Sequence, residues 1–110
     1  MQNGDKVGVV VDDMFFAAKI RGAIESAGRV IERVKSREQL EQLAADAPAL
    51  MIVDLNSDRL NPLDVIEFCK AQPALRDVPI IGFLSHVQVD LKRQAEMAGC
   101  DYVIPRSLFS

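Results

Sequence analysis

The feature that most restricts the fold of this chain is the alternation of short apolar runs with helical patterns along its length. Five runs have strand character: Val7–Val11, Arg29–Val34, Leu50–Val53, Val78–Phe83 and Tyr102–Ile104. The first, third and fourth are continuous rather than alternating, which indicates strands covered on both faces, as in a parallel sheet. The second run alternates apolar and polar residues and is typical of an edge strand.

Helical patterns lie between these runs, and several carry end signals. Apolar residues over 16–27 recur with a period of about 3.6 residues, and Gly28 stands where a C-terminal cap belongs. Ser36 and Asn61 are placed as N-terminal caps of two further helices, and a fourth stripe runs over 87–98. Strands that alternate with helices in this way predict right-handed crossovers and an α/β parallel sheet with helices on both faces.

Length, charge and cysteine content narrow the class of protein. The chain has 110 residues, which predicts one domain over residues 1–110, and its net charge of −3 gives no electrostatic reason to expect nucleic acid. No apolar run approaches the roughly 18 residues that a membrane span needs. Cys69 and Cys100 lack metal-binding spacing and are expected to be buried, reduced thiols, as in a cytoplasmic protein.

Acidic residues gather at the predicted carboxyl ends of the strands, where open parallel sheets bind ligands. Asp12 and Asp13 follow the first strand, and Asp54 closes the third. We expect these three carboxylates to converge, in a cluster that suits Mg²⁺. The simpler alternative is that the aspartates cap the following helices. The first loop contains no glycine, which argues against a nucleotide or flavin phosphate site.

Four segments resemble the receiver domains of bacterial response regulators in their order and spacing. Val10–Asp13 resembles the start of that family, where an acidic pair holds Mg²⁺, and Ile52–Asn56 resembles the strand with the phospho-accepting aspartate. Val78–Ile81 resembles the fourth strand, and Ala98–Val103 resembles the segment before the fifth. The resemblance covers nearly the whole chain, and it implies a flavodoxin-like, doubly wound parallel sheet of five strands in the order 2-1-3-4-5.

Carried over by position, the resemblance implies a site for phosphoryl transfer in two-component signalling. Asp54 would be the phospho-acceptor, Asp12 and Asp13 the metal carboxylates, and the backbone carbonyl of Asn56 a further Mg²⁺ ligand. In the family, the aspartate carboxylate attacks a phosphodonor while Mg²⁺ neutralises charge. The resemblance also implies a sensor histidine kinase or another signalling protein as partner, and a signalling module rather than an enzyme.

The ends of the fourth and fifth strands depart from the family pattern. The family has a Thr or Ser at the end of strand 4, whereas an ungapped count places Leu84 there, with Ser85 one residue late. The family has Lys-Pro after strand 5, whereas this chain has Pro105-Arg106. One count places Arg106 on the Lys position, another places Pro105 there, and both stay open. The metal half of the site is kept and the switch half is degenerate, which indicates an atypical or pseudo-receiver.

Two other functions are compatible with the same residues. The first is a phosphorylation-independent protein-interaction module on a receiver scaffold, since one fold hosts many functions. The second is a metal-dependent phosphatase-like enzyme, which would need a second catalytic acid or a phosphate-binding loop that the sequence does not offer. His86, the one histidine, is expected at the surface.

The last residues predict an incomplete final layer. Receivers close with a fifth helix, and here Leu108 and Phe109 resemble only its opening before Ser110, whereas a stable helix needs about a dozen residues. We therefore expect the fifth helix to be absent or truncated. The face beside the fifth strand is then expected to form a homodimer or to dock on a partner that supplies the missing cover.

Overall fold

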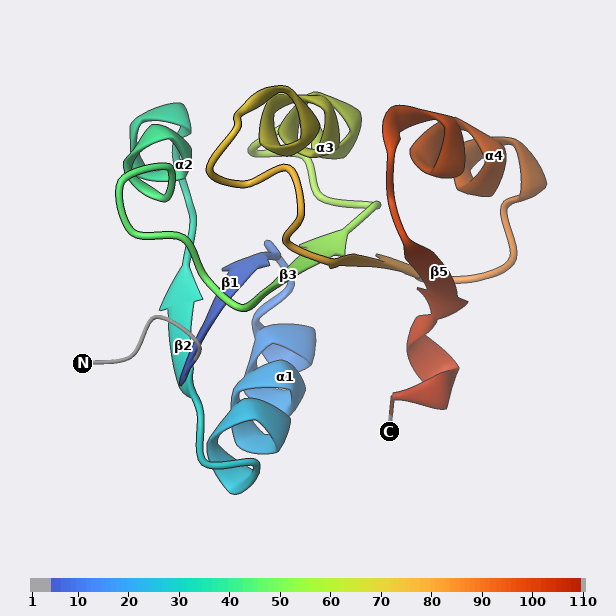
Figure 1. Ribbon diagram of the computed structural model, residues 1–110. Coiled ribbons are helices and arrows are strands. Elements are labelled where there is room, and N and C mark those ends of the chain that lie inside the picture. Colours follow the sequence, from blue (N-terminus) through green and yellow to red (C-terminus); the bar gives the residue numbers. More distant parts are fainter. Residues whose placement is uncertain (1–4, 110) are drawn as a thin grey trace.

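The computed structural model describes residues 5–109 and contains five strands that alternate with four α-helices (Figure 1). The strands are β1 (Lys6–Val10), β2 (Val30–Arg33), β3 (Leu50–Asp54), β4 (Ile80–Leu84) and β5 (Tyr102–Pro105). The helices are α1 (Met14–Ser26), α2 (Arg37–Gln42), α3 (Pro62–Ala71) and α4 (Val89–Ala98), and the short 3₁₀ helix η2 (Arg106–Leu108) follows β5.

All five strands form one parallel sheet in the order β2-β1-β3-β4-β5, which confirms the predicted doubly wound topology. β2 lies at an edge, as its alternating pattern predicts. Helix α1 lies on one face of the sheet, and α2, α3 and α4 cover the other (Figure 1). The carboxyl ends of the neighbouring strands β1 and β3 therefore open at one edge of the sheet, between these two layers.

The continuous apolar runs fill a core on both faces of the sheet. Successive strand side chains point to opposite faces, so adjacent residues of one strand enter different clusters. Val9 and Ile52 pack in the cluster that contains α1, whereas Val10 and Val53 pack in the cluster under α2, α3 and α4. The double coverage explains why β1 and β3 lack polar alternation.

The predicted helix caps are confirmed, with one boundary corrected. The Ser36 hydroxyl accepts from the backbone N–H of Gln39, and the Asn61 side chain accepts from two N–H groups in the first turn of α3. Helix α4 begins at Val89 rather than Val87, because Gln88 has an extended backbone, and Val87 is 78 % exposed. Among residues 5–109, no helix is long and apolar enough to cross a bilayer.

The two cysteines are buried and free, as predicted. Cys69 lies in α3, and Cys100 lies just before β5. Burial raises the pKa of the Cys69 thiol to about 11 and also raises the pKa of Cys100. Neither thiol is therefore ionised near neutral pH, which agrees with a structural role in the core.

The flank beside β5 carries no fifth α-helix within residues 5–109, but it is not left bare. Phe109 packs edge-on against Phe83 and Phe16, with ring centroids 5.2 and 5.8 Å apart. Ile81 and Ile104 on this face remain only partly buried. One aromatic side chain thus supplies part of the expected cover, and self-association through this flank stays a prediction.

Replacement of Phe109 by alanine should lower the free energy of unfolding by about 2 kcal/mol, because the ring is half-buried between two aromatic neighbours. Urea denaturation measures this loss. Leu108→Ala is the matched control, since Leu108 is 70 % exposed and should change the stability little. Equal effects of the two substitutions would contradict the packing role of Phe109.

Candidate functional site

A buried carboxylate at the end of β3 is the centre of the site. The Asp54 residue is 1 % exposed. Its Oδ2 accepts a hydrogen bond from Nη2 of Arg106, and its Oδ1 accepts from the backbone N–H of Asn56 at 3.1 Å. A charge this deeply buried needs such partners, because an unpaired carboxylate loses its hydration without compensation.

Arg106 joins Asp54 to the end of β1. Its Nη1 lies 3.0 Å from Oδ2 of Asp13, and its guanidinium carbon lies 4.5 Å from the centroid of the Phe16 ring. The planar guanidinium presents several donors in a fixed fork, so one arginine can bridge two carboxylates. Its Nε is buried and has no hydrogen-bond partner among the described residues. Two acidic side chains from neighbouring strand ends thus converge on one cation.

Asp13 has two roles, one for each of its carboxylate oxygens. Oδ1 caps α1 by accepting from the backbone N–H groups of Phe15 and Phe16 at 2.9 and 3.0 Å, as the capping alternative predicts. Oδ2 faces Arg106. The hydrogen bond from the Phe16 N–H lowers the pKa of Asp13 most. Desolvation raises it, and the Arg106 contact and the Phe15 N–H lower it further, so the pKa lies below its ordinary value.

Asp12 holds the loop after β3 through two backbone hydrogen bonds. Its Oδ2 accepts from the backbone N–H groups of Asp58 and Arg59 at 2.6 and 2.9 Å. Burial raises the pKa of Asp12, but these two hydrogen bonds, with the charges of Arg59 and Arg33, outweigh it and leave the pKa below its ordinary value. The side chain therefore connects the end of β1 to the segment that follows Asp54.

The structure brings two of the three expected carboxylates onto one cation, and the metal-ligand roles of Asp12, Asp13 and Asp54 stay a prediction. Asp13 and Asp54 share Arg106, whereas Asp12 is directed to the loop. Within residues 5–109, no group of three or more His, Cys, Asp or Glu side chains is placed to hold a metal ion. The physical reason is that backbone N–H groups and a guanidinium already satisfy these oxygens.

The ends of β4 and β5 locate the remaining predicted residues. Leu84 is buried as the last residue of β4 and pairs in register with Pro105, the last residue of β5. Ser85 follows Leu84 at the surface, and its hydroxyl contacts Nδ1 of His86 at 3.1 Å. Of the two residues that alternative counts place on the Lys position, Arg106 is the one that reaches Asp54.

A side-chain bridge fastens the loops after β3 and β4 to each other. Asn56 accepts from the backbone N–H of Ser85 at 2.8 Å and donates to Oε1 of Gln88 at 3.0 Å. The Asn56 side chain is therefore structural here. The predicted role of its backbone carbonyl is a separate matter and stays a prediction.

Three residues of the site were missed in the sequence. The Phe16 ring lies under the guanidinium, Gln88 bonds Asn56, and the buried Ser57 hydroxyl has no partner among the described residues. The spacing of Phe16 indicates a core position on α1, but nothing in it indicates that the ring would contact an arginine 90 positions later. Ser57 and Gln88 carry no sequence signal of their own.

The donor chemistry of the site fits a divalent cation. The Arg106 guanidinium stands between Asp13 and Asp54, with Nη1 on one carboxylate and Nη2 on the other. Carboxylate oxygens are the ligands that Mg²⁺ prefers, with water and phosphate oxygens completing its shell. Magnesium therefore suits the residues present, in competition with the guanidinium for the same oxygens.

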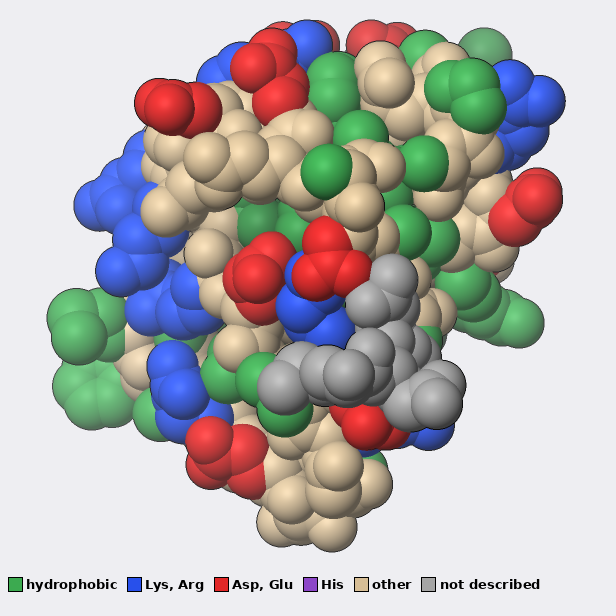
Figure 2. Space-filling model, turned by 60° about the vertical axis from the view of Figure 1, so that its left-hand side comes forward, with side chains coloured by type: hydrophobic (Ala, Val, Ile, Leu, Met, Phe, Trp, Pro, Cys, Tyr) green, Lys and Arg blue, Asp and Glu red, His purple; other side chains and the backbone are tan. Residues whose placement is uncertain are grey.

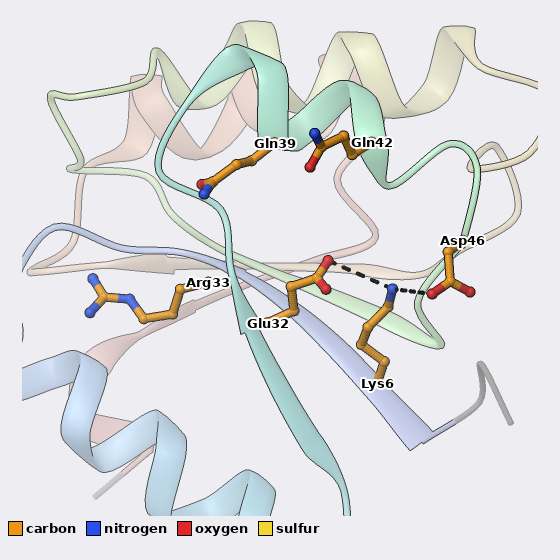
Figure 3. A pocket seen from close by; sticks show the side chains of 6 residues that line it. All are labelled: Lys6, Glu32, Arg33, Gln39, Gln42 and Asp46. Carbon is orange, nitrogen blue, oxygen red and sulfur yellow. Dashed lines mark hydrogen bonds and ion pairs between the residues drawn. The ribbon is translucent and has the colours of Figure 1, made fainter. Parts of the chain in front are cut away.

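A polar hollow of about 340 Å³ lies at the β2 edge of the sheet and does not include the acidic site around Asp54 (Figure 3). Lys6 lies there between two acids, with Nζ 2.9 Å from Asp46 and 3.6 Å from Glu32. Figure 2 brings this edge forward and shows acidic and basic side chains next to one another. Such paired charges are typical of a solvated ion-pair network rather than of a reactive centre.

The lowered pKa of Asp12 predicts a pH-dependent contribution to stability. Its ionised form stabilises the fold above the ordinary value of 3.8, and this contribution is lost as the pH falls through the lower folded-state value. The urea midpoint of Asp12→Asn should lie below that of the wild type at neutral pH, and the two should converge below about pH 4. Asp77→Asn, an exposed change before β4, is the control. Its urea midpoint should follow that of the wild type at every pH.

Comparisons with known proteins give a result at the level of structure only. No family model matches the sequence, and no curated protein matches it significantly. The phosphorylated cyanobacterial phytochrome response regulator RcpA superposes with a TM-score of 0.81 at 18 % identity, over 96 % of this chain and 86 % of that chain. The chemotaxis protein CheY4 of Vibrio cholerae has a TM-score of 0.79 at 18 % identity, over 92 % and 84 %.

A third solved structure is a response regulator from Burkholderia pseudomallei with a phosphorylated aspartic acid, a calcium ion and citrate. It has a TM-score of 0.78 at 19 % identity, over 92 % of this chain and 59 % of that chain. The strand order and helix placement described above agree with these similarities. The chain therefore has the fold of CheY-like response regulator receiver domains.

Proposed function

We propose that this chain is a cytoplasmic receiver domain of two-component signalling, in which Asp54 accepts a phosphoryl group. The observation that carries the proposal is the convergence of Asp54 and Asp13 on one cationic group at the carboxyl ends of β3 and β1. Two solved structures of the same fold support it, because one is a phosphorylated response regulator and another holds a phosphorylated aspartic acid with a calcium ion.

In this proposal each side chain has a defined task. An Asp54 oxygen forms the bond to phosphorus while the leaving group departs from the phosphodonor. Asp12, Asp13, Asp54 and the Asn56 carbonyl hold Mg²⁺, which when bound supplies charge neutralisation at the phosphoryl oxygens. Arg106 gives up its contact with Asp54 and donates to the phosphoryl group, for which its unpartnered Nε leaves capacity.

The switch half of the site is proposed to be degenerate. Leu84 is the last residue of β4 and offers no hydroxyl, while the Ser85 hydroxyl contacts Nδ1 of His86. A phosphoryl group on Asp54 would therefore lack the hydroxyl contact that the family uses at this strand end. The partner of the domain would be a sensor histidine kinase or another signalling protein.

A second candidate function is a phosphorylation-independent interaction module on the same scaffold. The observation that favours it is that the acidic oxygens are already satisfied, with Arg106 on Asp54 and two backbone N–H groups on Asp12. In that case, a signalling partner would bind this paired state as it stands. A second copy of the chain at the β5 flank is an alternative partner.

Incubation with Mg²⁺ and a small phosphodonor such as acetyl phosphate should add one phosphoryl group, detected by intact mass. Asp54 should be the one modified residue, because it stands at the end of β3, where the family carries its phospho-accepting aspartate. Asp54→Asn should abolish the mass increase, whereas Asp46→Asn, an aspartate paired to Lys6 near the β2 edge, should retain it. Labelling that persists in Asp54→Asn would contradict the assignment, and an unmodified wild type would favour the interaction module.

Millimolar Mg²⁺ should raise the thermal midpoint by a few degrees, because a ligand that binds only the folded state stabilises it by mass action. Asp13→Asn should weaken this response, since it removes one carboxylate that faces the shared cation. Differential scanning calorimetry over a magnesium series measures the change, with Asp46→Asn again as the control. A midpoint that does not move across the series would count against the metal ligands proposed here.

A further inference from the structure

The turn that follows β5 is fastened to the acidic site at its start and to the aromatic core at its end. Arg106 opens the turn and pairs with Asp54, and Phe109 closes it against the α1 face of the sheet. The backbone N–H of Phe109 donates to the carbonyl of Arg106 at 2.9 Å. The two side chains are therefore held at a fixed spacing by one turn of backbone.

The contacts of this turn form a closed path through the sheet. The Phe109 ring packs on Phe83 at 5.2 Å, and Phe83 is the register partner of Asp54 in the neighbouring strand. The Phe16 ring contacts both ends of the turn. Its centroid lies 4.5 Å from the guanidinium carbon of Arg106 and 5.8 Å from the centroid of the Phe109 ring. Both ends of the turn therefore rest on the same Phe16 ring.

We propose that the charge at Asp54 sets the position of the 106–109 turn through Arg106, and that this turn is the output element of the domain. With Asp54 charged and paired, Arg106 holds the turn closed and Phe109 docks on Phe83. When Asp54 loses its charge or carries a phosphoryl group, Arg106 leaves the carboxylate oxygen, for the phosphoryl oxygens where these are present, and the turn opens. The inference rests on the proposed function for the event that changes Asp54. The Arg106 contact would take the place of the hydroxyl contact that is missing at the end of β4.

Two observations make the turn suited to such a movement. Arg106 keeps a second carboxylate, Asp13, and the Phe16 ring when it leaves Asp54, so its charge is not stranded. Phe109 is half-buried rather than enclosed, so its ring can undock without opening the core. The buried Asp54 contact is then the one that decides between the two positions.

Asp54→Asn tests the coupling without metal or phosphate. Asparagine keeps an oxygen for the Asn56 N–H but lacks the negative charge that holds Arg106. Hydrogen exchange of the Phe109 amide, followed by NMR on the full chain, should accelerate on the order of tenfold, because the turn that protects this amide opens more often. The Phe109 ring signals should shift with it, and Asp46→Asn should leave both unchanged.

Arg106→Gln breaks the same contact from the other partner and guards against poor folding of the Asp54 variant. It should give the same acceleration at Phe109, and the Asp54→Asn, Arg106→Gln double variant should add nothing further. Wild-type exchange at Phe109 in both single variants would overturn the coupling. A phosphodonor that fails to modify Asp54 would overturn the proposed function and leave this result standing, so the two failures are distinguishable.

Discussion

The structure of the site depends on the ion pair between Asp54 and Arg106. Asp54 is the one buried charged residue among residues 5–109, and it stands at the end of a central strand with apolar neighbours. Removal of either member of such a pair costs roughly 3–5 kcal/mol, because the other charge is left without hydration or partner. The same Arg106 also contacts Asp13, so the ion pair joins the ends of β3 and β1 to the start of η2.

Parallel topology explains why the partners meet. The strand order reverses between β1 and β3, so the carboxyl ends of these strands lie side by side while their connections leave to opposite faces. Asp13 and Asp54 extend from those two ends. Arg106 directly follows β5 at the far edge of the sheet, and its side chain contacts both carboxylates.

The choice of arginine has consequences that lysine would not have. A guanidinium bridges two carboxylates in one plane and stacks on an aromatic ring, whereas an ammonium acts as a compact point charge. Here the fork contacts Asp13 and Asp54 while Phe16 supports its face. Arg106 therefore connects the acidic site directly to the aromatic core. In the family pattern, the corresponding contact to the site comes from a hydroxyl at the end of β4.

Local patterns along the chain are enough to predict the class of fold and the approximate strand ends. Continuous apolar runs require a sheet covered on both faces, and caps such as Ser36 and Asn61 act within a few residues, so local patterns suffice for them. The partners of the acidic side chains, by contrast, depend on contacts between distant parts of the chain. Asp12 bonds a loop 46 residues away, and Arg106 rather than Pro105 reaches Asp54 across 52 residues. Those contacts depend on how five strands and a terminal turn pack in space. An aspartate looks the same in the sequence whether an N–H group, a guanidinium or a metal ion binds its carboxylate.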